Sequence, residues 1–236
     1  MLGYAWRMKW ILKRIGRLLA IIAMASLTFA MVRAISRLPL RATPGSALFS
    51  MAIGLACGLI LLSLFPVGRR LYVIGHELTH FLTAKLFRRR TGKLRIKSDH
   101  GSVSVENPNI WIILAPYFVP FYALVWLILI MVVQLFYQSR IVTLVAYGGL
   151  GFLYAYHLVT TVWALQDGQS DLDHHGRVLS FSLIICVNVM ILFFSLMLLS
   201  NNFKRGILEV ARAYEAQYRA AKLLFVDDLT KENKSP

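Results

Sequence analysis

The chain has 236 residues, of which 58% are hydrophobic and 16% carry a formal charge. Soluble domains have about 45–50% apolar and about 25% charged residues, so this composition is typical of a membrane protein. The net charge of +15 could indicate nucleic-acid binding. However, the basic residues gather between apolar runs, where they orient membrane spans and contact anionic headgroups. We therefore expect the lipid bilayer as a partner and exclude nucleic acid.

The first segment, residues 1–46, is basic and contains one short apolar run. This run, Leu18–Val32, is shorter than the about 20 residues that a spanning helix needs. It is a tilted first membrane helix, a helix that lies on the membrane surface, or a signal-like segment.

The second segment, residues 47–200, is predicted to form a membrane-embedded core. Pro116 and Pro120 predict a kink near the start of its second long apolar run. Each long run has the length of a membrane helix and no charged residue. The runs are Ala47–Val67, Ile110–Gln138, Ile141–Gln166 and Val178–Asn202.

Between the first two long runs lie a shorter apolar segment, Leu71–Phe87, and a stretch of different character at 92–107. That stretch alternates apolar with polar residues around turn residues at Ser98–Gly101, which predicts a β-hairpin. The expected fold is therefore an all-α polytopic membrane protein with five to six transmembrane helices. The small hairpin follows the helix formed by Leu71–Phe87.

The third segment, residues 201–236, is predicted to be an amphipathic helix followed by a tail. Such a helix lies on a membrane or on a protein surface. Its proposed stripe consists of Ile207, Ala211, Tyr214, Tyr218 and Ala221.

The apolar segment Leu71–Phe87 contains the sequence His76-Glu77-Leu78-Thr79-His80. Histidines four residues apart share one helix face, with Cβ atoms about 5–6 Å apart, so both imidazoles can bind one cation. Glu77 lies at the edge of that face, where it can reach a metal-bound water without becoming a ligand. Three ionisable residues within an apolar segment are costly, which favours a functional site.

A catalytic zinc ion usually has three protein ligands, so a third must come from elsewhere in the chain. Between residues 110 and 200 the acids lie in one loop, which also contains two histidines. This loop is the expected donor region, and Asp167, Asp171 and His174 remain open as the ligand. Asp173 and His175 are expected to belong to a solvated connector.

The chain resembles the site-2 protease family of membrane-embedded zinc metalloproteases over about Ala47–Ser200. The resemblance rests on Gly75-His76-Glu77-Leu78-Thr79-His80-Phe81 in an apolar helix, a hairpin after it, and spans leading to an aspartate. It implies one Zn²⁺ per chain held by the motif histidines and that aspartate, with the motif glutamate as base. It also implies a membrane-protein or peptide substrate and a location in the bacterial cytoplasmic (inner) membrane.

The setting of the aspartate departs from the family's common pattern. The family commonly has Asn-Pro-Asp-Gly or Leu-Asp-Gly, whereas Gln166-Asp167-Gly168 retains only Asp-Gly. Divergent bacterial members are closer to Gln169-Ser170-Asp171-Leu172. The resemblance therefore implies Asp171 as the third ligand, with Asp167 and His174 as alternates.

The expected function is that of a zinc-dependent intramembrane endopeptidase. The alternative is a catalytically inactive relative that binds substrate helices without cleaving them. The intact Glu77 favours the enzyme, because a structural site has no need for a base. Of the other polar residues in the spans, His157 and Asn188 are expected to bond neighbouring helices, and Tyr117 to have a packing or interfacial role.

Overall fold

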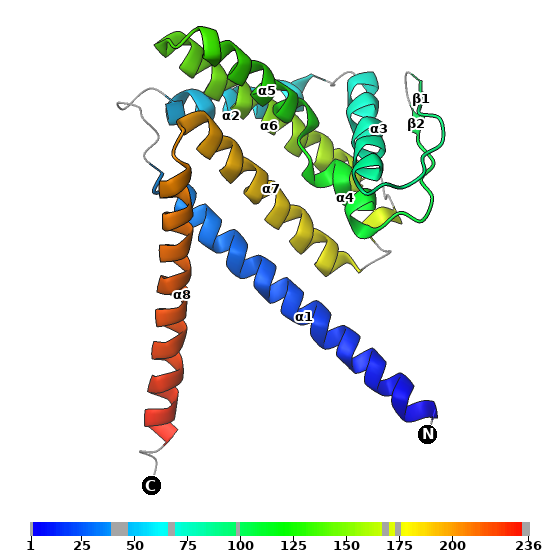
Figure 1. The fold of residues 1–236 in the computed structure, drawn as a ribbon, viewed down its shortest axis with the longest axis vertical. Helices are drawn as coiled ribbons and strands as arrows, with labels where there is room; N and C mark the ends of the chain where they lie inside the picture. Colours follow the sequence, from blue (N-terminus) through cyan, green and yellow to red (C-terminus); the bar gives the residue numbers. More distant parts are fainter. Residues whose placement is uncertain are drawn as a thin grey trace. The chain divides into compact units, whose positions relative to one another are not determined.

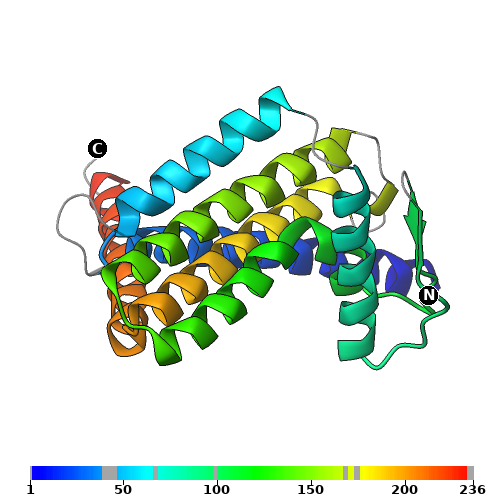
Figure 2. The same cartoon turned by 90° about the horizontal axis from the view of Figure 1, so that it is seen from above.

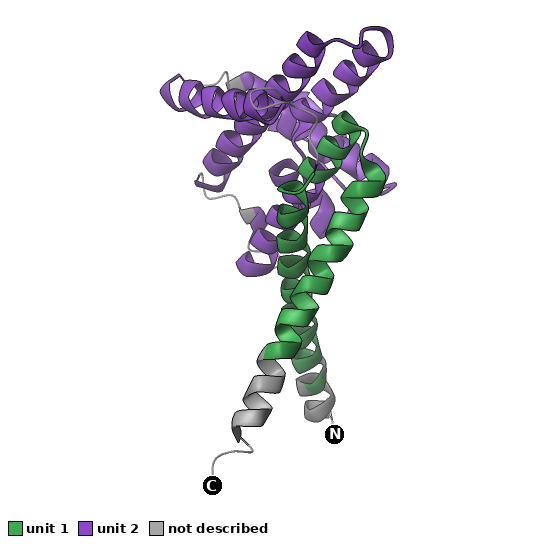
Figure 3. Cartoon of the chain, turned by 90° about the vertical axis from the view of Figure 1, so that its left-hand side faces the viewer, with its two compact units in different colours: residues 1–39, 192–236 green, residues 40–191 purple. Residues whose placement is uncertain are grey.

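The computed structural model describes residues 2–38, 47–65, 69–97, 100–166, 170–172 and 176–232. These residues are mostly helical and form eight α-helices, a two-stranded hairpin and one short 3₁₀ helix (Figure 1). They fall into two compact units, 1–39 with 192–236, and 40–191 (Figure 3). The division by sequence treats the two chain ends as separate segments, whereas the structure groups them in one unit.

The unit formed by the chain ends contains α1 (Leu2–Ile35) and α8 (Phe203–Glu232), which pack against each other. The hydroxyl of Ser26 on α1 donates a 2.7 Å hydrogen bond to the side-chain oxygen of Gln217 on α8. Helix α1 extends well beyond the short apolar run expected there. Its stretch Trp10–Ile35 is long and apolar enough to cross a membrane, which favours the spanning alternative.

The face of α8 that is buried in this unit differs from the predicted stripe. Gly206, Glu209 and Ala213 are buried, whereas Ile207 and Tyr218 are 62% and 69% exposed. Small residues at Gly206 and Ala213 allow close helix contact, and this outweighs the burial of larger apolar side chains. The predicted stripe lies on the exposed side of the helix, which is compatible with a helix that lies on a membrane or protein surface.

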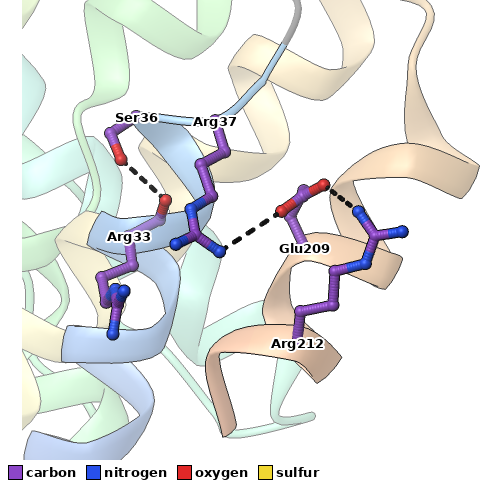
Figure 4. A network of polar contacts seen from close by, with 5 residues as sticks. All are labelled: Arg33, Ser36, Arg37, Glu209 and Arg212. Carbon is purple, nitrogen blue, oxygen red and sulfur yellow. Dashed lines mark hydrogen bonds and ion pairs between the residues drawn. The ribbon is translucent and has the colours of Figure 1, made fainter. Parts of the chain in front are cut away.

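A buried carboxylate on α8 is neutralised by arginines (Figure 4). Glu209 Oε1 lies 2.7 Å from Nη1 of Arg212, and Oε2 lies 3.9 Å from Nη1 of Arg37. A buried charge is costly unless it is paired, so these contacts fix the direction in which this face of α8 packs.

In the second unit, α2 (Ala47–Leu64) and α6 (Arg140–Gln166) lie side by side (Figure 2). A Cβ atom added at Gly54 would lie 2.0 Å from the carbonyl oxygen of Gly148, and one at Gly151 would lie 2.1 Å from that of Met51. The two backbones therefore touch, which only small residues permit in membrane helices.

The apolar run after the hairpin forms α4 (Ile110–Phe118) and α5 (Phe121–Phe136), which are bent by 69° relative to each other. Pro116 lies within α4 and Pro120 is the residue before α5. Proline lacks the N–H that the helix needs, so the predicted kink is confirmed.

Four described helices are long and apolar enough to cross a membrane, or five if α4 and α5 form one broken span. This set is compatible with an integral membrane protein, and it includes α1 and α7 (Arg177–Ser200). It does not include α3 (Arg69–Leu86), which covers the expected apolar segment Leu71–Phe87. The reason is charge, because α3 carries Arg69, Arg70, Glu77 and Lys85 within 18 residues.

The hairpin is confirmed within residues 92–107, although its strands are shorter than the alternating pattern predicts. Strands β1 (Arg95–Ile96) and β2 (Gly101–Ser102) are antiparallel, with Arg95 opposite Ser102. An isolated bridge between Thr91 and Val105 extends the pairing. Both strands contact α3, beside which the hairpin lies in Figure 2.

Candidate metal centre

The two motif histidines lie on one face of α3. The centroids of the His76 and His80 rings are 4.9 Å apart and the ring planes are 79° from parallel. The helical spacing of four residues produces this approach directly.

The tautomer of His80 follows from its neighbour on α4. Its Nδ1 lies 2.8 Å from the carbonyl oxygen of Ile112. A carbonyl can only accept a hydrogen bond, so Nδ1 carries the proton and Nε2 has a lone pair for a metal ion. The Ile112 carbonyl is available because Pro116, four residues later, has no N–H to donate to it.

His76 is held from two sides by tyrosines. Its Nδ1 lies 3.1 Å from the hydroxyl of Tyr72, one helical turn earlier on α3. The Tyr117 ring of α4 packs edge-on against the imidazole, with centroids 5.9 Å apart. In the tautomer whose Nδ1 donates to the Tyr72 hydroxyl, Nε2 has the lone pair that a metal ion needs, as in His80.

Asp171 reaches the same region from the 3₁₀ helix Ser170–Leu172. Tyr117 donates a 3.0 Å hydrogen bond from its hydroxyl to Oδ2 of Asp171. The carboxylate also interacts electrostatically with Glu77 and His80. The structure thus brings Asp171 to the motif, while the alternates Asp167 and His174 lie outside the described residues, as do Asp173 and His175.

Glu77 faces the hairpin. The backbone N–H of Val103 donates a hydrogen bond to its carboxylate. Gly101 packs directly on the same side chain, because a Cβ atom there would lie 2.5 Å from Cγ of Glu77. Only glycine fits at this position without displacing the carboxylate.

The donor chemistry fits zinc. Two imidazoles with bonded Nδ1 atoms and a nearby carboxylate are a typical ligand set for this ion. No group of three or more His, Cys, Asp or Glu side chains is assembled as a metal site among the residues that the structure describes. His76, His80 and Asp171 are the residues that would hold the ion.

A second polar cluster surrounds His157, which is 7% exposed on α6. Its Nε2 lies 3.0 Å from the side-chain oxygen of Asn188 on α7, and its ring also bonds the Tyr117 carbonyl. Asn188 donates a 3.0 Å hydrogen bond to that same carbonyl. Both residues bond neighbouring helices, so their predicted structural role is confirmed.

Sequence reasoning missed the residues that orient the motif. Tyr117 packs as expected, and in addition its hydroxyl bonds Asp171 and its carbonyl bonds two other side chains. Tyr72 precedes His76 by four residues, which is a helical-face signal that could have found it. The spacing of Pro116 from Ile112 could likewise have indicated a freed carbonyl.

The chain was compared with protein-family models, curated proteins and solved structures, and no match was found in any of the three.

Proposed function

We propose that this protein is a zinc-dependent intramembrane endopeptidase that hydrolyses peptide bonds in or near substrate transmembrane helices. The observation that carries the proposal is the pair of imidazoles on α3, each hydrogen-bonded through Nδ1. Hydrogen bonds of this kind set the tautomer and orientation of metal-binding histidines. A structural role alone gives no reason for two such histidines to flank a glutamate.

When bound, zinc would lower the pKa of a coordinated water to about 7 and polarise the substrate carbonyl. His76, His80 and Asp171 would supply the ligands, and Tyr117 would orient Asp171 through its hydroxyl. Glu77 would accept a proton from the attacking water as the water oxygen bonds to the carbonyl carbon. It would then deliver this proton to the amide nitrogen as the carbon–nitrogen bond breaks.

The membrane setting supports a substrate that is itself a helix in the bilayer. The long apolar helices are compatible with an integral membrane protein. A substrate helix in the bilayer has its carbonyls engaged in intrahelical hydrogen bonds, so it must unwind locally before a peptide bond can react.

The decisive experiment compares Glu77→Gln with wild type on a transmembrane peptide reconstituted with the purified protein. Wild type should contain one zinc per chain and cleave the peptide. Glu77→Gln should retain zinc and cleave at least about 100-fold more slowly, because it lacks the base. Glu215→Gln is the matched control, since Glu215 is exposed on α8 and bonds Arg219.

Metal content tests the ligands separately. His76→Ala and His80→Ala should each lose zinc, whereas the exposed His100 should tolerate alanine without loss. Wild-type protein that holds no zinc under metal-replete conditions would contradict the proposal. Equal cleavage by wild type and Glu77→Gln would exclude the proposed role of the base.

A further inference from the structure

A small cavity lies beside His76, between α3, the α4–α5 break and α6. It has about 30 Å³ for water-sized molecules, which is room for about two. Besides His76, its polar lining includes Tyr72, Tyr122 and Tyr156. A space that holds a water molecule also has room for the oxygen of a peptide carbonyl group.

The tyrosine hydroxyls differ in whether they are already bonded. The Tyr72 hydroxyl contacts Nδ1 of His76, and that of Tyr122 donates a 2.6 Å bond to the Leu71 carbonyl. The Tyr156 hydroxyl is fully buried, and none of the described residues is its hydrogen-bond partner. Burying a hydroxyl without a partner is unfavourable. A bound group that accepts a hydrogen bond from Tyr156 would therefore be stabilised.

The position of Tyr156 is fixed by its neighbours. Its ring packs edge-on against Tyr122 with centroids 5.4 Å apart. It interacts electrostatically with both Tyr122 and Tyr72, and Tyr72 contacts His76. The unpartnered hydroxyl therefore belongs to the tyrosine cluster that borders the motif histidine.

We infer that the Tyr156 hydroxyl donates a hydrogen bond to the carbonyl oxygen of the peptide bond being cleaved. This inference rests on the proposed function and assigns a further catalytic residue to it. As water adds to the carbonyl carbon, the carbonyl π electrons move to the oxygen, which becomes negatively charged. Tyr156 keeps its proton and stabilises that charge through the hydrogen bond, in a site that excludes most water.

The test is Tyr156→Phe, with Tyr147→Phe as the matched control. Tyr147 is also buried on α6 but does not line the cavity. Tyr156→Phe should retain one zinc per chain, lower kcat by about 100-fold and leave KM within about twofold. It should also bind a phosphinic peptide, whose tetrahedral phosphorus carries an anionic oxygen, at least about tenfold more weakly. Tyr147→Phe should match wild type in all of these measurements.

Thermal unfolding separates this role from a structural one. Loss of an unpartnered buried hydroxyl should leave the melting temperature of Tyr156→Phe unchanged or raise it, whereas loss of a structural hydrogen bond should lower it. Wild-type kcat and phosphinic-peptide affinity in Tyr156→Phe would overturn the inference alone. Wild-type protein without zinc or cleavage would instead overturn the proposed function on which it rests.

Discussion

Two histidines use the broken helix α4–α5 in the same way but with different outcomes. His80 bonds the Ile112 carbonyl, and His157 bonds the Tyr117 carbonyl together with Asn188. Both carbonyls lack their usual helical donor, the first because of Pro116 and the second because the helix breaks before residue 121. The N–H of Phe121 bonds Val119 instead.

The difference lies in the other partners of each ring. His157 also contacts the side-chain oxygen of Asn188, so both of its described hydrogen-bond partners are residues of neighbouring helices. His80 is bonded by the described residues through Nδ1, and its ring lies against that of His76. A histidine between membrane helices is therefore best interpreted from all the partners of its ring.

The largest effect is expected at Asp171, whose carboxylate lies with His76 and His80 and not with the cluster around His157. Asp171→Asn keeps an acceptor for the Tyr117 hydroxyl but removes the charge. We expect zinc affinity to fall by more than about 100-fold, since even residues that only orient a ligand contribute 10–100-fold. Chelator competition measures this affinity, with Asp167→Asn as the control from the same loop. Loss of zinc in the Asp167 variant alone would transfer the ligand role to that residue.

A smaller effect is expected at Tyr117, where the two clusters meet. Tyr117→Phe removes the hydroxyl that bonds Asp171 and leaves the carbonyl that bonds Asn188. Zinc affinity should fall by about 10–100-fold while the free energy of unfolding changes little. Tyr137→Phe, at an exposed position after α5, should bind zinc like wild type. An unaltered zinc affinity in Tyr117→Phe would mean that this hydrogen bond does not orient Asp171.

The smallest effect is expected in the cluster around His157 and Asn188. Asn188→Leu removes the bonds to His157 and to the Tyr117 carbonyl. The free energy of unfolding should fall by about 1 kcal/mol, the size of an interhelical hydrogen bond in a membrane, while zinc per chain stays the same. Detergent-titrated unfolding measures it, with Ser182→Ala as the control because Ser182 bonds its own helix turn at the Val178 carbonyl. Zinc loss in Asn188→Leu would mean that the cluster around His157 also contributes to metal binding.

The sequence predicts the parts of this molecule that depend on local pattern. The apolar runs, the hairpin, the proline kink and the spacing of His76 and His80 follow from composition and helical geometry. The partners of these residues depend on tertiary packing. Nothing in the sequence around Tyr117 indicates that its hydroxyl bonds Asp171, 54 residues later. Tyr156 gave no signal either, because an aromatic residue in an apolar run is ordinarily packing.

The buried face of α8 shows the same limit. Its stripe was identified from helical spacing, whereas the face buried in the unit contains Gly206 and Ala213. The charge of Glu209 also had to be satisfied there by Arg212. Periodicity reports which residues share a face, whereas the choice of face depends on the neighbouring helix.

The hairpin contacts Glu77, so two separate chain segments position this carboxylate. Glu77 is anchored on a helix, but Val103 and Gly101 hold its carboxylate from the hairpin. A two-stranded hairpin is only marginally stable by itself, so this one depends on its packing against α3. If Glu77 acts as the proposed base, the position of its carboxylate therefore depends on the hairpin as well as on α3.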